Sequence, residues 1–185
     1  MEDDMELKTV NETLNTYIRP QTFPIAIKLF TAKETLPAKV KIPVKDMGYP
    51  IALCQAWGLS RRHGWTVAVG QQDQCCIGGH IAMGFMEHPP QGAPGDADNR
   101  LEPGQYAFMV SAPIDRTDFE PDLIALYVNS AQAMRLAQAA GAEVVGIGTL
   151  VEKIFEGGRD ALKPLNVPVE SLVCITSMED GKILF

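Results

Sequence analysis

Short apolar segments of strand length alternate along this chain with segments of helical periodicity, and this alternation constrains the fold more than any other feature. Apolar residues recur at spacings of three and four over residues 6–18, which predicts a helix. Residues 24–30, 65–69 and 106–113 form short, largely apolar runs that are typical of strands. Strands alternating with helices predict an α/β fold, here a small mixed sheet with flanking helices.

The alternation continues to the carboxy terminus. Further helices are expected at residues 50–60, 81–86 and 130–140. Further strands are expected at residues 122–128, 144–148, 171–176 and 182–185. Residues 87–104 are rich in proline and glycine and predict a loop. The strands after residue 140 make the C-terminal part βαβ-like.

The charge balance limits the partners of the chain. It has 185 residues, a net charge of −7 at pH 7 and a pI of about 4.9, which argues against nucleic acid or an anionic membrane. No apolar run approaches the roughly 20 residues of a membrane span, and the acidic start lacks the basic residues of a signal peptide. We therefore expect a cytoplasmic protein without nucleic-acid or membrane partners. A small-molecule ligand and a homo-oligomer are both compatible with this composition.

Two adjacent cysteines carry the clearest chemical signal. Cys75 and Cys76 precede a Gly-Gly pair and His80, and Cys54 lies upstream. Adjacent thiols beside glycines place soft ligands where the backbone can approach a metal or cluster closely. We interpret Cys54, Cys75, Cys76 and His80 as a candidate site for zinc, an iron–sulfur cluster or thiol redox chemistry.

The alternative is that the cysteines are structural. Free cysteines are among the most often buried residues, so Cys54 is also compatible with a small core position, and Cys174 lies in an apolar run that is expected in the core. A closed metal site requires His80 or a second subunit in addition to three thiolates. A structural or binding module with inert cysteines therefore stays open beside the metal or redox site.

Two polar groups fit helix ends. Arg61, Arg62 and His63 form a basic cluster at the expected end of a helix, where cations are favourable, although a bound anion is an alternative. Asn129 and Ser130 precede the Ala-rich helix and are suited to cap it.

Five short sequence motifs in the first part of the chain match a known family. They are residues 24–29 (PIAIKL), 54–56 (CQA), 76–79 (CIGG) with 83–85 (MGF), 119–122 (FEPD) and 129–136 (NSAQAMRL). Through these phrases, residues from about 23 to 140 resemble the uncharacterised ArCR family, also called domain of unknown function 169. The resemblance implies a cysteine-bearing site. The chain departs from the family in a shortened stretch between residues 85 and 101, and it lacks the further carboxy-terminal cysteine segments.

The last part of the chain matches a different family. Its phrases are residues 141–148 (GAEVVGIG), 151–159 (VEKIFEGGR), 169–172 (VESL) and 177–182 (SMEDGK). These are similar to the end of xanthine phosphoribosyltransferases, in which this region builds the purine pocket. The resemblance implies that Lys153 hydrogen-bonds a purine base and that Phe155 stacks on it. Without the resemblance, Lys153 would be a solvated neighbour of Glu152, and Phe155 would be a core residue.

The phosphate-binding half of such a transferase is missing from the sequence. That family uses two adjacent acidic residues and a small-residue loop at a helix amino terminus, and the corresponding residues 125–131 (ALYVNSA) hold no acidic pair. An inactive remnant of a purine phosphoribosyltransferase is therefore the alternative to the cysteine-site protein. We expect a chimera of an ArCR-like segment, residues 1–140, and a phosphoribosyltransferase-like segment, residues 141–185. If both pack as one domain, Met134 and Leu136 should be buried against Val145 and Ile147.

Overall fold

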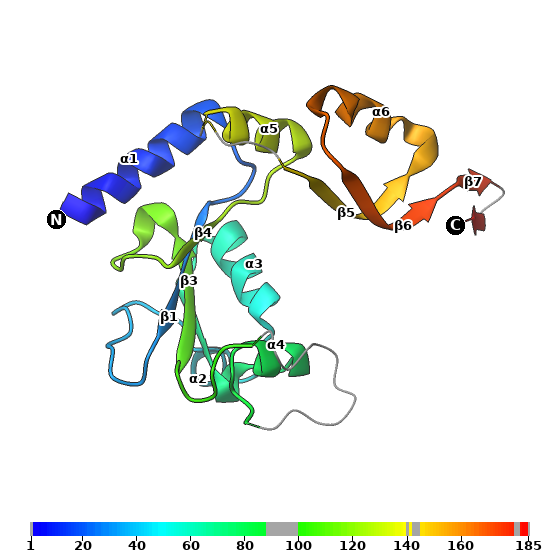
Figure 1. Cartoon of the computed structure of the whole chain (residues 1–185). Helices are drawn as coiled ribbons and strands as arrows, with labels where there is room; N and C mark the ends of the chain where they lie inside the picture. Colours follow the sequence, from blue (N-terminus) through cyan, green and yellow to red (C-terminus); the bar gives the residue numbers. More distant parts are fainter. Residues whose placement is uncertain (1, 88–99, 140, 142–144, 180–181, 185) are drawn as a thin grey trace. The chain divides into compact units, whose positions relative to one another are not determined.

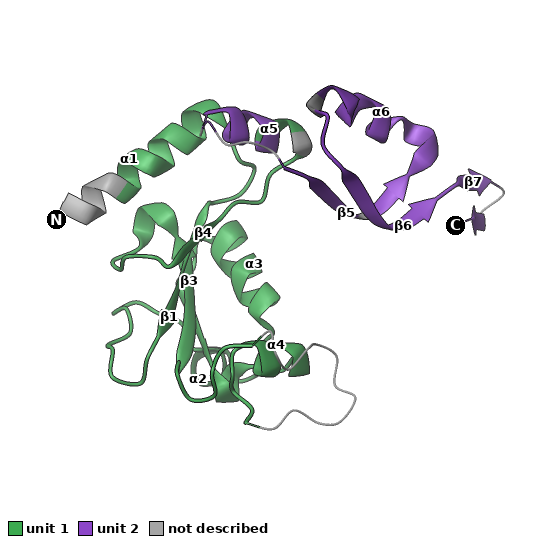
Figure 2. Cartoon of the chain, in the orientation of Figure 1, with its two compact units in different colours: residues 1–132 green, residues 133–185 purple. Residues whose placement is uncertain are grey.

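The computed structural model describes residues 2–87, 100–139, 141, 145–179 and 182–184. The chain divides into two compact units, unit 1 (Met1–Gln132) and unit 2 (Ala133–Phe185), which Figure 2 shows in different colours. The boundary between them falls inside helix α5 (Ser130–Ala139). None of the helices in the described part of the chain is both long and apolar enough to span a bilayer.

A four-stranded antiparallel sheet organises unit 1 (Figure 1). Its strands are β1 (Ile25–Phe30), β2 (Val67–Gly70), β3 (Phe108–Pro113) and β4 (Leu123–Ala125). They lie in the order β2-β3-β1-β4, so the amino-terminal strand β1 is central and pairs along its whole length with β3. Strand order therefore brings segments far apart in the chain, such as those of Ile25 and Pro113, into register.

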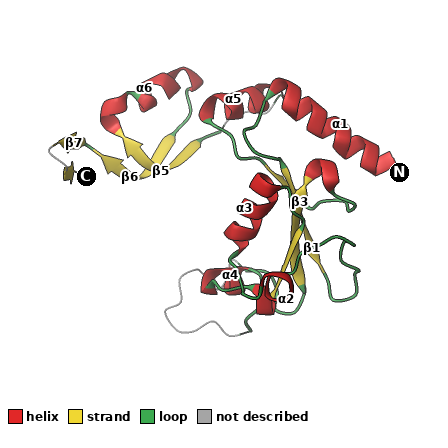
Figure 3. Ribbon diagram, turned by 180° about the vertical axis from the view of Figure 1, so that it is seen from behind, coloured by secondary structure: helices red, strands yellow, loops and turns green. Residues whose placement is uncertain are grey.

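The helices of unit 1 are short apart from the first. They are α1 (Glu2–Tyr17), α2 (Pro43–Met47), α3 (Leu53–His63) and α4 (Ile77–Ala82), together with the 3₁₀ turns η1 (Gln71–Asp73) and η2 (Ile114–Arg116). Helix α3 packs along the sheet (Figure 3). The buried hydroxyl of Ser60 fixes its position, because it lies 3.0 Å from the Ser111 carbonyl oxygen and 2.8 Å from the Ser111 hydroxyl.

The sheet of unit 1 is buried on both faces. On one face Ile25, Val67 and Met109 pack in a cluster with residues of α3, including Ala56. On the other face a smaller cluster forms around Phe30, Ala68 and Val110, with Leu36, Val40, Ile42, Phe108 and Phe119 packed against it. Consecutive residues of the same strand are therefore fully buried, and this double coverage gives unit 1 a core of its own.

Unit 2 is a strand–helix–strand unit followed by a hairpin. Its described elements are β5 (Ile147–Lys153), η3 (Ile154–Glu156), α6 (Gly158–Leu162), η4 (Lys163–Leu165), β6 (Val169–Ile175), β7 (Ser177–Glu179) and β8 (Lys182–Leu184). Strands β5 and β6 are parallel and are joined through α6, whereas β7 and β8 are antiparallel. The expected α/β class and the βαβ-like carboxy-terminal part are thereby confirmed.

Several element boundaries differ from the sequence expectations. The helix expected at 81–86 is α4, which begins directly after Cys76, and the strand expected at 122–128 is the shorter β4. Helix α6 lies in a segment for which no helix was expected, because the pair of Gly157 and Gly158 at its start is a local helix breaker. The expected burial of Val145 under α5 is wrong, since its side chain is 79% exposed. The loop expected at residues 87–104 lies largely outside the described residues.

Candidate functional site

Three exposed thiols lie at the beginnings of two helices of unit 1. Cys54 is the second residue of α3, and Cys76 is the residue immediately before α4. Cys75 lies between η1 and α4, and its thiol is exposed as well. The alternative of inert core residues therefore does not describe these three positions. Their thiols are accessible for chemistry.

Backbone hydrogen bonds join the two cysteine segments. The Cys75 amide donates to the carbonyl oxygen of Ile51 at 3.2 Å, and the Ile51 amide donates to that of Asp73 at 2.7 Å. Ile51 is three residues before Cys54, so this short parallel bridge brings the turn of Cys75 and Cys76 beside the start of α3. The bridge is itself supported by the buried Asp73, whose carboxylate accepts the amides of Val44 and Gly70 at 2.9 and 3.2 Å.

The side chain of Gln74 sets the shape of the cysteine turn. It is 4% exposed, and its Oε1 accepts the amide of Cys76 at 2.9 Å. Gly79 makes room for it, because a Cβ at that position would overlap the side-chain nitrogen of Gln74. Gly79 of the Gly-Gly pair therefore makes room for Gln74 under the turn, whereas a Cβ at Gly78 would only contact the Cys76 sulfur at 3.8 Å.

His80 faces the same glutamine backbone. Its Nε2 lies 2.9 Å from the carbonyl oxygen of Gln74, and its ring packs edge-on against Phe85. Since a carbonyl can only accept, Nε2 carries the hydrogen, and only Nδ1 has a free lone pair in the neutral ring. Nδ1 is buried and has no hydrogen-bond partner among the described residues. His80 could therefore bind a metal only through Nδ1.

The four candidate ligands do not form a ready metal site. Within the described residues, no three His, Cys, Asp or Glu side chains come together as a group that could hold a metal ion. A zinc or iron–sulfur site at Cys54, Cys75, Cys76 and His80 thus stays a prediction. In this arrangement it would need a side-chain rearrangement or ligands from another molecule.

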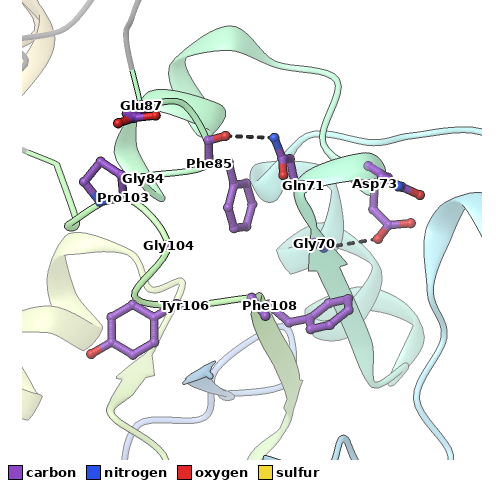
Figure 4. A pocket seen from close by; sticks show the side chains of 12 residues that line it. Gly70, Gln71, Asp73, Gly84, Phe85, Glu87, Pro103, Gly104, Tyr106 and Phe108 are labelled. Carbon is purple, nitrogen blue, oxygen red and sulfur yellow. Dashed lines mark hydrogen bonds between the residues drawn. The ribbon is translucent and has the colours of Figure 1, made fainter. Parts of the chain in front are cut away.

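A hollow of about 680 Å³ opens where the turn η1 leads toward the cysteines (Figure 4). Gln71 and Asp73 border it from η1, and Phe85 and Phe108 contribute aromatic rings. The side-chain amide of Gln71 donates to the Phe85 carbonyl oxygen at 3.0 Å and ties η1 to the segment after α4. This hollow is large enough for a small molecule, and it adjoins the segment that carries Cys75.

Glycines form two walls of this hollow, and the sequence analysis did not identify them. Gly84 has φ +64°, and a Cβ there would come within 2.5 Å of the Leu101 carbonyl oxygen. A Cβ at Gly70 would come within 2.7 Å of the Phe108 ring. The close approach of backbone at Gly84 requires glycine, and the single signal for it in the sequence was the phrase Met-Gly-Phe after α4.

Lys153 and Phe155 lie in unit 2, where β5 ends. Lys153 is the last residue of β5, and its Nζ is 4.0 Å from the Glu156 carboxylate. Phe155 follows in η3 and is 50% exposed, so it is not the core residue that the alternative interpretation required. Both side chains are accessible and are separated by one residue.

Glu152 is not a solvated neighbour of Lys153, because Arg159 holds it from α6. The guanidinium donates to both carboxylate oxygens, at 2.8 and 2.6 Å, and to the Val169 carbonyl oxygen at 2.8 Å. The hydroxyl of Ser171 also donates to the carboxylate, and the thiol of Cys174 lies 3.9 Å from it. This polar clamp joins β5, α6 and β6.

The clamp changes the acidity of its carboxylate. The hydrogen bonds from Arg159, and then that from Ser171, lower the pKa of Glu152 to about 2. The same contact raises the pKa of Arg159. Both groups are therefore charged throughout the neutral range, and the ion pair is a fixed part of unit 2.

Comparison with known families identifies the larger part of the chain. The sequence pattern of domain of unknown function 169, described as uncharacterised ArCR, matches residues 13–98 and 96–146. The chain belongs to the uncharacterised ArCR family. The resemblance found in the first part of the sequence is thereby confirmed, and the match includes the segments of all three thiols.

Curated relatives show the second similarity. A xanthine phosphoribosyltransferase of Clostridium perfringens is 52% identical over 50 residues, which is 27% of this chain and 26% of that protein. That of Moorella thermoacetica is 38% identical over 73 residues, or 40% of this chain and 37% of that protein. This ArCR chain therefore spans between about a quarter and a third of the length of these relatives. No solved structure matches it significantly.

Proposed function

We propose that this ArCR protein works through thiol chemistry at Cys54, Cys75 and Cys76. The observation that carries the proposal is the exposure of all three thiols on two helix beginnings that the Cys75–Ile51 hydrogen bond holds side by side. Two thiols brought together in this way can be oxidised to a disulfide if their Cα atoms lie within about 7 Å of each other. The rigid support of Gln74 and Asp73 beneath the turn favours one defined pairing.

The chemistry is thiol–disulfide exchange. The thiolate of Cys54 attacks one sulfur of a low-molecular-weight disulfide and releases the other half as a thiol. A thiolate of Cys75 or Cys76 then attacks the mixed disulfide at the Cys54 sulfur and releases the second thiol. Two protein thiols are oxidised, one acceptor disulfide is reduced, and two protons pass from the cysteines to the two released thiols.

Mass spectrometry of the protein after treatment with oxidised glutathione tests this proposal. We expect a loss of two hydrogens and a cross-linked peptide pair that joins Cys54 to the segment of Cys75 and Cys76. Cys54→Ser should abolish this cross-link. Cys174→Ser is the matched control, because it removes the fourth free cysteine from unit 2 and should leave the cross-link unchanged.

Two results would contradict the redox proposal. One is the absence of any disulfide after oxidation, with all three thiols still reactive toward an alkylating reagent. The other is a stable metal or a cluster absorption band in protein purified without oxygen, which would make the thiols ligands instead. Ultraviolet–visible spectra and metal analysis of the same sample separate these outcomes.

The similarity to xanthine phosphoribosyltransferases supports a second candidate function for unit 2. Over 50 residues the identity is 52%, and Lys153 and Phe155 are both accessible. A lysine ammonium can donate to a purine carbonyl, and an exposed phenylalanine ring can stack on the base. This candidate is purine binding without phosphoribosyl transfer, because residues 125–131 hold no acidic pair for a magnesium-bound ribose diphosphate.

Calorimetry with xanthine tests the second candidate. Binding to the full chain should be lost in Phe155→Ala and weakened in Lys153→Ala. Lys163→Ala, which removes another exposed lysine of the same unit, should bind as the parent protein does. With ribose diphosphate and magnesium added, no nucleotide should form. Nucleotide formation that disappears in Lys153→Ala would show that the phosphate site is built from other residues.

A further inference from the structure

Two hollows meet at Arg61, at the carboxy-terminal end of α3. The first, of about 430 Å³, is lined from α1, from the connection between α1 and β1, from α3 and from η2. The second, of about 450 Å³, is lined from the same connection and from residues 126–129 and 132. Gln21, Thr22 and Arg61 belong to both linings, so the hollows are adjacent parts of one depression in unit 1.

Three buried polar atoms in the first hollow lack partners. Asn11 Oδ1, Thr22 Oγ1 and Asp115 Oδ1 are shielded from solvent and have no hydrogen bond within the described residues. The charge next to Asp115 is Arg116, whose Nε is 3.9 Å away and thus beyond hydrogen-bond distance. Unsatisfied buried polar atoms are unfavourable and rare, so three of them around one hollow favour a polar partner there, which water or a ligand can supply.

Arginine lines the same hollow. The guanidinium of Arg61 lies 4.1 Å from the ring centre of Tyr127, which holds it by stacking while its N–H edges stay available. Arg62 lines the hollow beside it. In the described part of the chain, neither guanidinium takes part in a hydrogen bond or salt bridge, and a stacked guanidinium is preorganised to bind a carboxylate through two parallel hydrogen bonds.

The wall that carries Thr22 is held in place from two sides. Arg19 has φ +53°, an uncommon conformation for a residue other than glycine, and starts the connection to β1. The side-chain amide of Gln132 donates to the carbonyl oxygens of Ile18 and Arg19 at 3.1 and 2.7 Å. From the other side, the Phe23 amide donates to the Arg61 carbonyl oxygen at 2.9 Å. The backbone of this wall is therefore in place before any ligand arrives.

We propose that this depression binds a free α-amino acid with an apolar side chain, independently of the thiol chemistry. The carboxylate would lie on Arg61, with Arg62 adding charge. The ammonium would donate to Asp115, Asn11 and Thr22 once small side-chain rotations expose their buried oxygens, and this supplies the partners that these oxygens lack. The side chain would enter the second hollow, whose lining includes Leu126, Tyr127 and Val128.

Binding of L-leucine to the full chain tests the proposal by calorimetry and by the ligand-dependent rise in melting temperature. Two analogues define the chemistry. Leucinamide lacks the carboxylate, and N-acetyl-leucine lacks the ammonium. Both should bind at least about tenfold more weakly than leucine, equivalent to about 1.4 kcal/mol.

Variants assign the contacts. Arg61→Gln and Asp115→Asn should each weaken leucine binding by about tenfold or more, and Arg61→Lys should restore part of it, since it keeps the charge but not the paired hydrogen bonds. Lys39→Gln is the matched control, an exposed cation of unit 1 that lines neither hollow, and should not change binding. The comparison of each variant with and without leucine separates binding from any change in stability.

Three results would overturn the proposal. The first is no binding or melting shift with leucine or with phenylalanine. The second is equal binding of N-acetyl-leucine with no effect of Asp115→Asn, which would reduce the site to an anion site. The third is unchanged leucine binding in Arg61→Gln, which would place the amino acid elsewhere on the chain.

Discussion

The two units differ in how their sheets are covered. In unit 1, Ala26, Val67 and Val110 are fully buried, and apolar clusters lie on both faces of the sheet. In unit 2, the strand β6 exposes 79% of Leu172, and β5 exposes 54% of Val151. A parallel sheet is stable when both of its faces are covered, and two strands with one short helix cannot provide that cover.

The difference shows two ways of holding a small α/β unit together. Unit 1 relies on apolar burial, which scales with the area removed from water. Unit 2 relies on the clamp between Glu152 and Arg159, with further bonds to Ser171 and to the backbone of Val169. An apolar core resists acid, whereas a clamp that depends on a charged carboxylate does not.

The largest expected effect is on the core of unit 1. Ile25→Ala should lower the free energy of unfolding by about 2–5 kcal/mol, because Ile25 is completely buried and its loss leaves a cavity. Leu172→Ala in unit 2 should change it by less than about 0.5 kcal/mol, since the side chain is exposed. Urea titrations of both variants measure the difference. A similar loss of unfolding free energy in the two variants would mean that Leu172 is covered in solution.

Limited proteolysis should show the same difference in stability between the two units, as a difference in cleavage rate. Sites within residues 145–179 should be cut about tenfold or more faster than sites within residues 25–83, corresponding to at least about 1.4 kcal/mol less opening free energy. Mass spectrometry of timed digests identifies the order of cleavage. If the first cuts fell inside β1 or α3, unit 1 would be the unit that opens more readily, contrary to this expectation.

Acid should destabilise unit 2 through Glu152. Its folded pKa of about 2 lies below the ordinary value of 4.5, so its contribution is complete above about pH 4.5 and is lost as the pH falls from there toward 2. The difference in unfolding free energy between the parent protein and Glu152→Gln should therefore shrink over this window. Glu179→Gln, an exposed acid in β7, serves as the control. A difference that does not change with pH would show that the clamp is absent in solution.

The smallest expected effect concerns helix α5, which contains the boundary between the two units. Asn129 caps α5, because its Oδ1 accepts the Gln132 amide at 2.9 Å while the Gln132 side chain accepts the Asn129 amide at the same distance. Asn129→Ala should lower the free energy of unfolding by about 1 kcal/mol, and Asn129→Ser should lower it by less. Thermal unfolding followed by circular dichroism measures both. An unchanged midpoint in Asn129→Ala would mean that the cap does not stabilise α5.

Several elements of the chain were largely predictable from local pattern. Strand β1 and helix α5 begin and end within about one residue of their expected positions, since apolar runs and capping residues act over a few neighbours. The cap at Asn129 was predicted for the same reason and is confirmed. Helix α6 was missed because the Gly-Gly pair before it is a local breaker, whereas the contact of Arg159 with Glu152 that stabilises it is not local.

The sequence by itself determined the residue types that carry chemistry: three cysteines and a histidine, an acidic composition, an ArCR segment, and a tail similar to part of xanthine phosphoribosyltransferases. Tertiary structure alone decided their arrangement. His80 turns its Nε2 to the Gln74 carbonyl instead of to the thiols, and Arg61 lines one hollow together with Asn11, Thr22 and Asp115 from three other parts of the chain. Such contacts depend on how strands and helices far apart in sequence pack together, and no local periodicity encodes that packing.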